Sequence, residues 1–407
     1  MKLSERVSSI EESVTLKLNT LANQLTSEGK KIFNLTAGQL PYRPPKDFVE
    51  NIRGELDFLK SFQYSPVAGE VALRQKLLDY FELSREVNLE DVDTTFSTIV
   101  GNGGKHVLAN IFACLVNPGD EVIVLAPFWL SYPEMIKVNG GVVRVLETTI
   151  FDAFTPSLSE LKEMINEKTK AIVINSPNNP SGIHYSDEWM KDFATLMLEY
   201  PEVTLISDEI YFELSYYDPA PTYFYQHKPE LLERTIVVDG ISKNLASTGL
   251  RLGFAIGPSA FIKGVSSYQG HTASGPCTLV QKALEKYDMS AIKEFLGPIK
   301  NHLRENSMIV RETFREAKLD KCWYQTTSAF YYLVDFSQCA IMERFRKSGE
   351  DDSDYSAQIC EEMIEKYGVA MVPGVSFGVK NCARISLVLP KEPFTEAMSI
   401  IVKALLD

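Results

Sequence analysis

Four short segments of the sequence contain residues that could bind an anion, hold a proton or form a covalent bond with an aldehyde. Each segment follows a short apolar run that predicts a β-strand. Because ligands in open parallel sheets bind beyond the carboxyl ends of the strands, we expect the four segments to meet at one rim. They are residues 101–105 (Gly-Asn-Gly-Gly-Lys), 175–182 (Asn-Ser-Pro-Asn-Asn-Pro-Ser-Gly), 207–211 (Ser-Asp-Glu-Ile-Tyr) and 239–243 (Asp-Gly-Ile-Ser-Lys).

Each segment also has an ordinary structural explanation. Glycine clusters and Asn-Pro-Ser-Gly are common in turns, an aspartate at this place could cap a helix, and a single lysine usually lies on the surface. The order and spacing of the segments favour a shared site instead. Asn179, Asp208, Lys243 and Arg251 together supply groups that one cofactor, pyridoxal 5'-phosphate, requires.

The ring of pyridoxal phosphate withdraws electrons best when its nitrogen stays protonated. A carboxylate beside the nitrogen favours that charged form, and Asp208 suits this role. Asn179 and Tyr211 could donate hydrogen bonds to the phenolate oxygen of the ring. Lys243 offers the primary amine that binds the cofactor as a Schiff base and, once released, acts as the base that moves a proton.

The cofactor phosphate requires a separate anion site. The backbone amides of Gly103, Gly104 and Lys105 would form it at the start of a helix, where unpaired N–H groups and the helix dipole favour an anion. Ser242 and Arg251 could complete this site.

With these residues in place, the sequence from about residue 14 to its end resembles the class I aminotransferases of the fold type I pyridoxal-phosphate family. The resemblance rests on several motifs in combination. They are Asn-Pro-Ser-Gly at 179–182, Asp-Glu-Ile-Tyr at 208–211, Ser242-Lys243 with Arg251 eight residues on, Pro-Gly-Val-Ser-Phe-Gly at 373–378, and Arg384 in Ala-Arg-Ile-Ser.

The resemblance implies roles for further residues. Lys243 would be the Schiff-base lysine, and Arg384 would bind the α-carboxylate of the substrate. Trp129 would stack on the cofactor ring, although it could instead be a core aromatic. The backbone of Gly38 would contact the substrate.

The family likeness also implies a homodimer with shared active sites. Tyr64 matches a tyrosine that family members donate to the cofactor phosphate of the other subunit. One branch of the family, with Gly-Gly-Lys at the phosphate helix, uses that lysine to bind a second, distal carboxylate of the substrate. Lys105 occupies this position here, and the alternative is that it belongs to the phosphate site only.

Two motifs depart from the family pattern. Many relatives have Gly-Glu-x-Asp-Phe where this sequence has Gly-Gln-Leu-Pro-Tyr at 38–42, and a glycine where Ser328 stands before Ala-Phe-Tyr. Both departures concern the entrance of the site or the small domain. A run rich in tyrosine, from Tyr216 to Tyr225, indicates either packing or a modified entrance.

The elements that must position these residues alternate between short apolar runs and amphipathic stretches. This alternation predicts an α/β fold, in which helices flank a mainly parallel sheet. After about residue 295 a long polar helix begins a smaller α/β domain. We expect a large domain over residues 46–295 and a small domain over 1–45 and 296–407, with a solvated acidic loop at 344–355. The strands expected in the large domain are 95–100, 121–125, 142–146, 171–174, 203–206, 235–238 and 252–256.

Composition narrows the possible functions. The 407 residues carry a formal net charge of −13, which argues against a nucleic-acid partner. The longest nearly unbroken apolar run, 107–116, is about half the length of a membrane span. The N-terminus does not have the pattern of a signal peptide, so we expect a cytoplasmic protein without a membrane partner. Five histidines and six cysteines show no spacing typical of a metal site.

Competing classes of protein explain the pattern less well. A dinucleotide-dependent dehydrogenase needs Gly-x-Gly-x-x-Gly, and a P-loop needs Ser or Thr after the lysine, but His106 stands at both of these positions. A cofactor-sensing regulator would need a DNA-binding domain, for which we expect the segment before Tyr64 to be too short. The remaining candidates are a β-lyase or decarboxylase on the same fold, or an aminotransferase for aromatic residues, alanine, methionine or prephenate. Aspartate with 2-oxoglutarate is the leading substrate pair.

Overall fold

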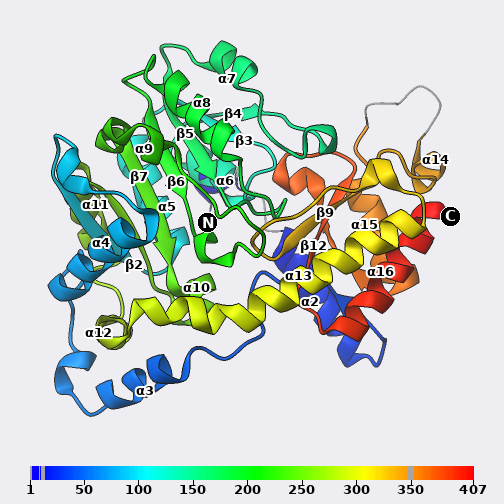
Figure 1. The fold of residues 1–407 in the computed structure, drawn as a ribbon, viewed down its shortest axis with the longest axis horizontal. Helices are drawn as coiled ribbons and strands as arrows, with labels where there is room; N and C mark the ends of the chain where they lie inside the picture. The colour runs from blue at the N-terminus through cyan, green and yellow to red at the C-terminus, as the bar shows by residue number, and fades with distance from the viewer. Residues whose placement is uncertain (1, 9, 11–13, 347–352) are drawn as a thin grey trace.

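A computed structural model describes residues 2–8, 10, 14–346 and 353–407. The larger part of the molecule is built around a central sheet (Figure 1). All neighbouring strands are parallel except β8, which is antiparallel to both of its neighbours. The spatial order of the seven strands is β2 (Phe96–Gly101), β8 (Gly253–Pro258), β7 (Thr235–Gly240), β6 (Thr204–Asp208), β5 (Thr169–Asn175), β3 (Glu121–Leu125) and β4 (Val142–Leu146).

The predicted mainly parallel sheet is therefore confirmed, and each of the seven expected runs forms a strand. The sequence did not indicate the reversed direction of β8. This reversal has a direct consequence for the site, since β8 begins at the edge of the sheet where β7 ends. The connecting residues 241–252, which include Lys243 and Arg251, therefore stay at the carboxyl edge of the parallel strands.

Helices cover both faces of the sheet because successive strand residues point to opposite sides. On β3, Val122 and Val124 belong to one core cluster and Ile123 to the other. The first cluster packs against α5 (Gly104–Leu115), α6 (Ser131–Val138) and α11 (Ser259–Thr272). The second packs against α4 (Val71–Arg85), α8 (Asp187–Met197) and α12 (Thr278–Lys286).

A second, smaller α/β unit combines N-terminal and C-terminal segments and lies beside the first in Figure 1. Its three-stranded antiparallel sheet has the order β11-β12-β9, and a separate parallel pair joins β1 to β10. Its strands are β1 (Phe33–Asn34), β9 (Tyr331–Asp335), β10 (Val369–Ala370), β11 (Val372–Pro373) and β12 (Cys382–Ser386). Its helices are α2 (Val14–Ser27), α14 (Ile341–Phe345), α15 (Ser356–Tyr367) and α16 (Lys391–Leu406).

The long helix α13 (Ile292–Glu316) runs along both units (Figure 1). The predicted boundary at residue 295 falls inside its first turn, so the helix itself joins the two units. The N-terminal strand β1 pairs with β10 of the C-terminal part, with Phe33 opposite Val369. The division into 46–295 and 1–45 with 296–407 stays a proposal. Residues 347–352 of the expected acidic loop lie outside the described residues.

Gly253 provides a test of how tightly β8 approaches the start of α5. A Cβ atom at this position would lie 2.2 Å from the backbone nitrogen of Gly104. Because backbone would have to move, we expect Gly253→Ala to lower the free energy of unfolding by about 1 to 3 kcal/mol or more. Urea titration followed by circular dichroism measures this change.

The matched control is Gly264→Ala within α11, where an added Cβ meets nothing within 4 Å. Replacing a helical glycine in open space should stabilise the protein by up to about 1 kcal/mol. Equal unfolding midpoints for Gly253→Ala and Gly264→Ala would contradict the close approach of β8 to α5.

Candidate active site

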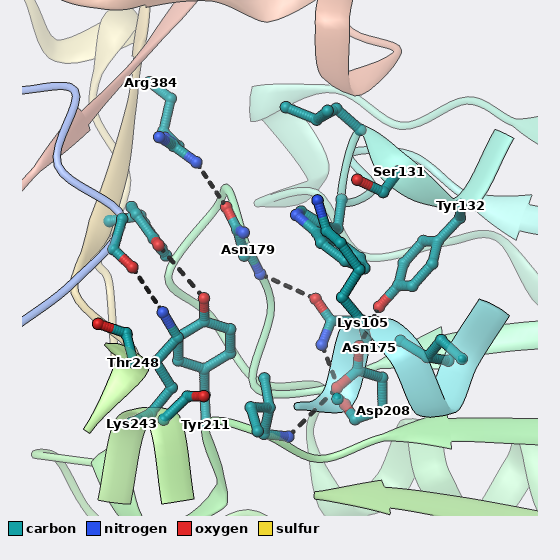
Figure 2. Close-up of a pocket in the computed structure, with 18 of the residues that line it drawn as sticks. Lys105, Ser131, Tyr132, Asn175, Asn179, Asp208, Tyr211, Lys243, Thr248 and Arg384 are labelled. Carbon is teal, nitrogen blue, oxygen red and sulfur yellow. Dashed lines mark hydrogen bonds between the residues drawn. The ribbon is translucent and has the colours of Figure 1, made fainter. Parts of the chain in front are cut away.

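A cavity of about 430 Å³ lies at the carboxyl edge of the large sheet, between this sheet and the small unit (Figure 2). This volume is within the range of small-molecule sites. The structure brings most of the residues singled out from the sequence into its wall. They are Gly38, Gly104, Lys105, Trp129, Asn179, Asp208, Tyr211, Ser242, Lys243, Arg251 and Arg384.

Two of the predicted site residues do not line the cavity. Gly103 precedes the first turn of α5 with a φ of +88°, and a Cβ atom there would lie 2.6 Å from a terminal nitrogen of Arg251. This glycine therefore lets the guanidinium of Arg251 approach the start of the helix. Tyr64 is 93% exposed and lies outside the cavity. Its contact with a second subunit stays a prediction.

Lys243 lies in α10 (Ile241–Asn244), directly after β7. Its Nζ donates a hydrogen bond of 2.5 Å to the carbonyl oxygen of Gly38 and lies 5.6 Å from the ring centre of Tyr211. Burial lowers the pKa of Lys243 to about 7, and the nearby Arg384 and Arg251 act in the same direction. A large share of this amine is therefore neutral, and so nucleophilic, at neutral pH.

Asp208 ends β6 and is buried at the base of the cavity. Its Oδ2 accepts a hydrogen bond of 2.5 Å from the phenol of Tyr132, and its Oδ1 accepts one of 3.3 Å from the backbone N–H of Ile210. Burial raises the pKa of Asp208 to about 6, and the bond from Tyr132 opposes that rise. A cation beside this carboxylate would hold it ionised.

Arg384 on β12 brings the small unit into the site. Its guanidinium donates to the side-chain oxygen of Asn179 at 3.1 Å (Figure 2). It also donates to the carbonyl oxygen of Thr36 at 3.0 Å. Its Cζ lies 4.5 Å from the ring centre of Tyr331. Within the described part of the chain, its buried Nε has no hydrogen-bond partner. Burial lowers the pKa of Arg384, so an anion bound here would stabilise the charge.

Two further cations complete the charge of the cavity. The Nζ of Lys105, in the first turn of α5, lies 4.9 Å from the ring centre of Trp129, and Arg251 donates to the carbonyl oxygen of Thr248 at 2.9 Å. Burial and the charge of Arg251 lower the pKa of Lys105. Among the described residues, none of the four cavity cations forms an ion pair with a carboxylate of the protein, which leaves their charge available to a ligand.

Several residues at the site had no role predicted from the sequence. Tyr132 holds Asp208, Asn175 donates to the backbone carbonyl of Asp208 at 2.9 Å, and Tyr331 lies 3.2 Å from the phenol oxygen of Tyr211. Thr248 also lines the cavity. Tyr331 belongs to the Ala-Phe-Tyr motif noted in the sequence, but only the tertiary fold shows which neighbours Tyr132 and Tyr331 bind.

The two departures from the family pattern both form contacts between distant segments. The side-chain oxygen of Gln39 accepts a hydrogen bond of 3.1 Å from Thr248. The hydroxyl of buried Ser328 lies 3.0 Å from Nδ1 of His184. The tyrosine-rich run packs mainly into the core, since Tyr216, Tyr223 and Tyr225 are buried. Of the two explanations for this run, packing is the one that these three side chains support.

Two other properties of the described residues concern metals and membranes. They contain no group of three or more His, Cys, Asp or Glu side chains placed to bind a metal ion. None of the helices in the same part of the chain combines the length and apolar character needed to cross a membrane.

The family follows from comparison with known proteins. Residues 30–401 match the family model described as aminotransferase class I and II, so the chain belongs to the class I and II aminotransferases. It is 34% identical to the aspartate/prephenate aminotransferase of Thermus thermophilus, with 97% of each chain covered. It is 31% identical to the aspartate aminotransferase of Bacillus sp. (strain YM-2), with 94% of each chain covered.

Solved structures give the same result. The structure of the aspartate aminotransferase from Thermus thermophilus with maleate superposes with a TM-score of 0.87, at 32% identity and with all of each chain covered. A structure of the aspartate aminotransferase from Thermotoga maritima gives a TM-score of 0.82 at 30% identity, with 98% of this chain and 99% of that chain covered. The chain therefore has the fold type I architecture and is an aminotransferase.

The low pKa of Lys243 can be measured in the protein free of cofactor. Competitive acetylation followed by mass spectrometry reports the neutral fraction of each lysine against pH. A lowered pKa makes the amine reactive at lower pH, so we expect a midpoint near pH 7 for Lys243, against about 10.4 for an ordinary lysine. Arg384→Met removes a cation that lowers this pKa and should move the midpoint upward. A midpoint near 10 in the wild type would contradict the electrostatic account of the site.

Proposed function

We propose that this aminotransferase moves the amino group of L-aspartate to a 2-oxo acid such as 2-oxoglutarate, with pyridoxal 5'-phosphate bound to Lys243. One observation carries the proposal. The described residues that line the cavity include four cations and one buried carboxylate, Asp208, and one of these cations is a lysine whose pKa lies near 7. Such a cavity complements a ligand that carries a phosphate and an aldehyde together with a substrate that carries carboxylates.

The residues of the cavity fit the cofactor. The start of α5 offers the amides of Gly103, Gly104 and Lys105, and Arg251 lies against Gly103 to supply a charge for the phosphate. Ser242 lies in the same wall. For the ring nitrogen, Asp208 is the buried carboxylate that the protonated form needs. Asn179 and Tyr211 provide donors, and Trp129 provides an aromatic face.

When bound, pyridoxal phosphate supplies an aldehyde that reacts with amines and a ring that accepts electrons from the carbon losing a proton. Lys243 supplies the amine that holds the cofactor and, in its neutral form, the base that takes up and returns that proton. Its low pKa serves both tasks, because only the neutral amine is nucleophilic or basic. Tyr132 holds Asp208 in place through its hydrogen bond.

The substrate would bind between the two units. Arg384 would form a two-armed pair with the α-carboxylate, and its Nε, which has no partner among the described residues, supports this role. The carbonyl oxygen of Gly38 lies beside Lys243 and so borders the same space. Because Arg384 comes from β12 and Gly38 from the N-terminal segment, substrate binding would draw on both parts of the chain.

Lys105 is the candidate for the far end of the substrate. It lies beside Trp129 on the cavity wall and has no protein carboxylate as a partner in the described part of the chain. The relatives named for aspartate, and a solved relative with maleate, support a substrate with two carboxylates. Relatives named aspartate/prephenate aminotransferase make prephenate, which is also a 2-oxo acid with two carboxylates, the second candidate substrate.

We also infer a homodimer in which Tyr64 reaches the phosphate of the partner's cofactor. Tyr64 is 93% exposed and follows η1 (Leu59–Phe62), whose Leu59 and Phe62 are 76% and 65% exposed. Large apolar side chains that gather on one exposed segment favour burial in an interface. A second subunit would cover this segment and complete two sites at once.

Substrate choice can be tested with Lys105→Ala. Without the ammonium, a distal carboxylate loses its charge partner, so kcat/KM for aspartate should fall at least about tenfold, roughly 1.4 kcal/mol, with little change for alanine. The measurement is the cofactor absorbance change on mixing with each amino donor, which follows one half-reaction at a time. The wild type in the same donor panel should show aspartate as the preferred donor.

Lys137→Ala is the matched control, since Lys137 lies on α6 outside the cavity and pairs with Glu134. It should leave both donors unchanged. Equal losses for aspartate and alanine in the Lys105 variant would refute the distal-carboxylate role. A wild type that reacts with no amino donor would overturn the proposed function itself.

A further inference from the structure

The ends of the two strands that lead to Asp208 and Lys243 are joined by a buried arginine. Arg85 is the last residue of α4. Its Nε donates to Oε2 of Glu209 at 2.9 Å, and one of its terminal nitrogens donates to Oδ2 of Asp239 at 2.9 Å. All three side chains are almost completely buried.

The two carboxylates stand next to the reactive residues in the chain. Glu209 directly follows Asp208 at the end of β6, and Asp239 lies in β7, four residues before Lys243. One planar guanidinium therefore spans the carboxyl ends of two neighbouring strands. Any change in the separation of these ends must bend or break at least one of its two hydrogen bonds.

The remaining oxygens of both carboxylates are also bonded. Oε1 of Glu209 accepts from the hydroxyl of Ser207 at 2.8 Å and from the phenol of Tyr225 at 2.9 Å. Oδ1 of Asp239 accepts from the backbone N–H of Gly240 at 2.7 Å. The network is thus satisfied at both carboxylates, and a network satisfied in this way fixes positions firmly.

Aromatic rings enclose this network and extend it to a third loop. The Cζ of Arg85 lies 3.6 Å from the ring centre of Phe212. The rings of Tyr223 and Tyr225 stack with centres 5.3 Å apart, and the phenol of Tyr223 donates to the carbonyl oxygen of Ser176 at 3.1 Å. Ser176 lies in the segment that also carries Asn179. The tyrosine-rich run thereby links the segment after β5 to Glu209 at the end of β6.

A contribution to stability does not by itself explain why Arg85, Glu209 and Asp239 are buried together. Removing a guanidinium and two carboxylates from water is energetically costly, and apolar replacements of buried ion clusters are often no less stable. Burial raises the pKa of Glu209 to about 7 and that of Asp239 to about 6, and Arg85 opposes both shifts. The feature that apolar packing cannot reproduce is the directional tie between the two strand ends.

We propose that Arg85 is a positioning residue for the amino-transfer site: by bonding Glu209 and Asp239 together, it holds Asp208 and Lys243 at the separation that catalysis requires. The proposal rests on the function assigned above to Asp208 and Lys243. Arg85 is not among the residues that line the cavity, so it would act only through Glu209 and Asp239.

The decisive variant replaces the whole cluster with neutral residues of similar size, Arg85→Met, Glu209→Gln and Asp239→Asn. It leaves no unpaired buried charge, so we expect it to fold with a thermal midpoint close to that of the wild type. In the cofactor-loaded enzyme, kcat with aspartate should fall at least tenfold while KM changes less than threefold. In the cofactor-free protein, amide hydrogen exchange of the peptide spanning 239–244 should become at least tenfold faster.

Arg234→Met is the matched control, because this half-buried arginine donates to the carbonyl oxygens of Val203 and Met197 near the opposite end of β6. It should lower thermal stability without changing kcat or exchange in 239–244. If the triple variant fails to fold, Glu209→Gln provides the same test, since it removes one charged arm and keeps the shape. We expect it to lower kcat at least threefold and to speed exchange in the same peptide.

The proposal is overturned if a folded triple variant, or Glu209→Gln in its place, keeps both wild-type kcat and wild-type exchange. It is also overturned if Arg234→Met causes the same loss of kcat as the cluster variants. The exchange measurement needs no cofactor or substrate. It therefore separates failure of this proposal from failure of the proposed function, which would appear as a wild type inactive with every donor.

Discussion

The concentration of positive charge in one cavity of an acidic protein is the physical feature on which the site depends. The chain has a net charge of −13, yet Lys105, Lys243, Arg251 and Arg384 all line the same cavity. Cations brought together away from water repel one another and are poorly solvated. Here they bond to neutral acceptors, such as the carbonyl oxygens of Gly38 and Thr36. The outcome is a cavity that favours anionic ligands and keeps Lys243 easy to deprotonate.

The fold brings these charges together from distant parts of the chain. Because β5, β6 and β7 are parallel, the segments that follow them lie at one edge of the sheet. The reversed β8 keeps Arg251 at that edge with Lys243. The small unit adds Arg384, and the N-terminal segment adds Gly38. Two hydrogen bonds join this N-terminal segment to the loop between β7 and β8: Lys243 donates to the carbonyl oxygen of Gly38, and Thr248 donates to the side-chain oxygen of Gln39. Beneath the cavity, the Arg85 cluster ties the strand ends that carry Asp208 and Lys243.

Much of this arrangement could be predicted from sequence because local patterns determine it. Alternating apolar runs identified the strands, and unusual residues directly after each run identified Asn179, Asp208 and Lys243. The direction of β8 could not be predicted, since an apolar run has the same composition in either orientation. The role of Arg85 could not be predicted either, because an arginine at the end of an amphipathic helix normally faces solvent. Its partners, Glu209 and Asp239, lie 124 and 154 residues away in the chain. The hydrogen bond between Tyr132 and Asp208 could not be predicted either, because only the tertiary fold brings the two residues together.

The central claim is that Lys243 is the amine that holds the cofactor. The most direct test is to add pyridoxal 5'-phosphate to the purified protein, reduce with borohydride, digest and map the added mass by peptide sequencing in a mass spectrometer. The account predicts one cofactor mass per chain, on the peptide that contains Lys243. Cofactor mass on Lys105 or another lysine, with the Lys243 peptide unmodified, would contradict it.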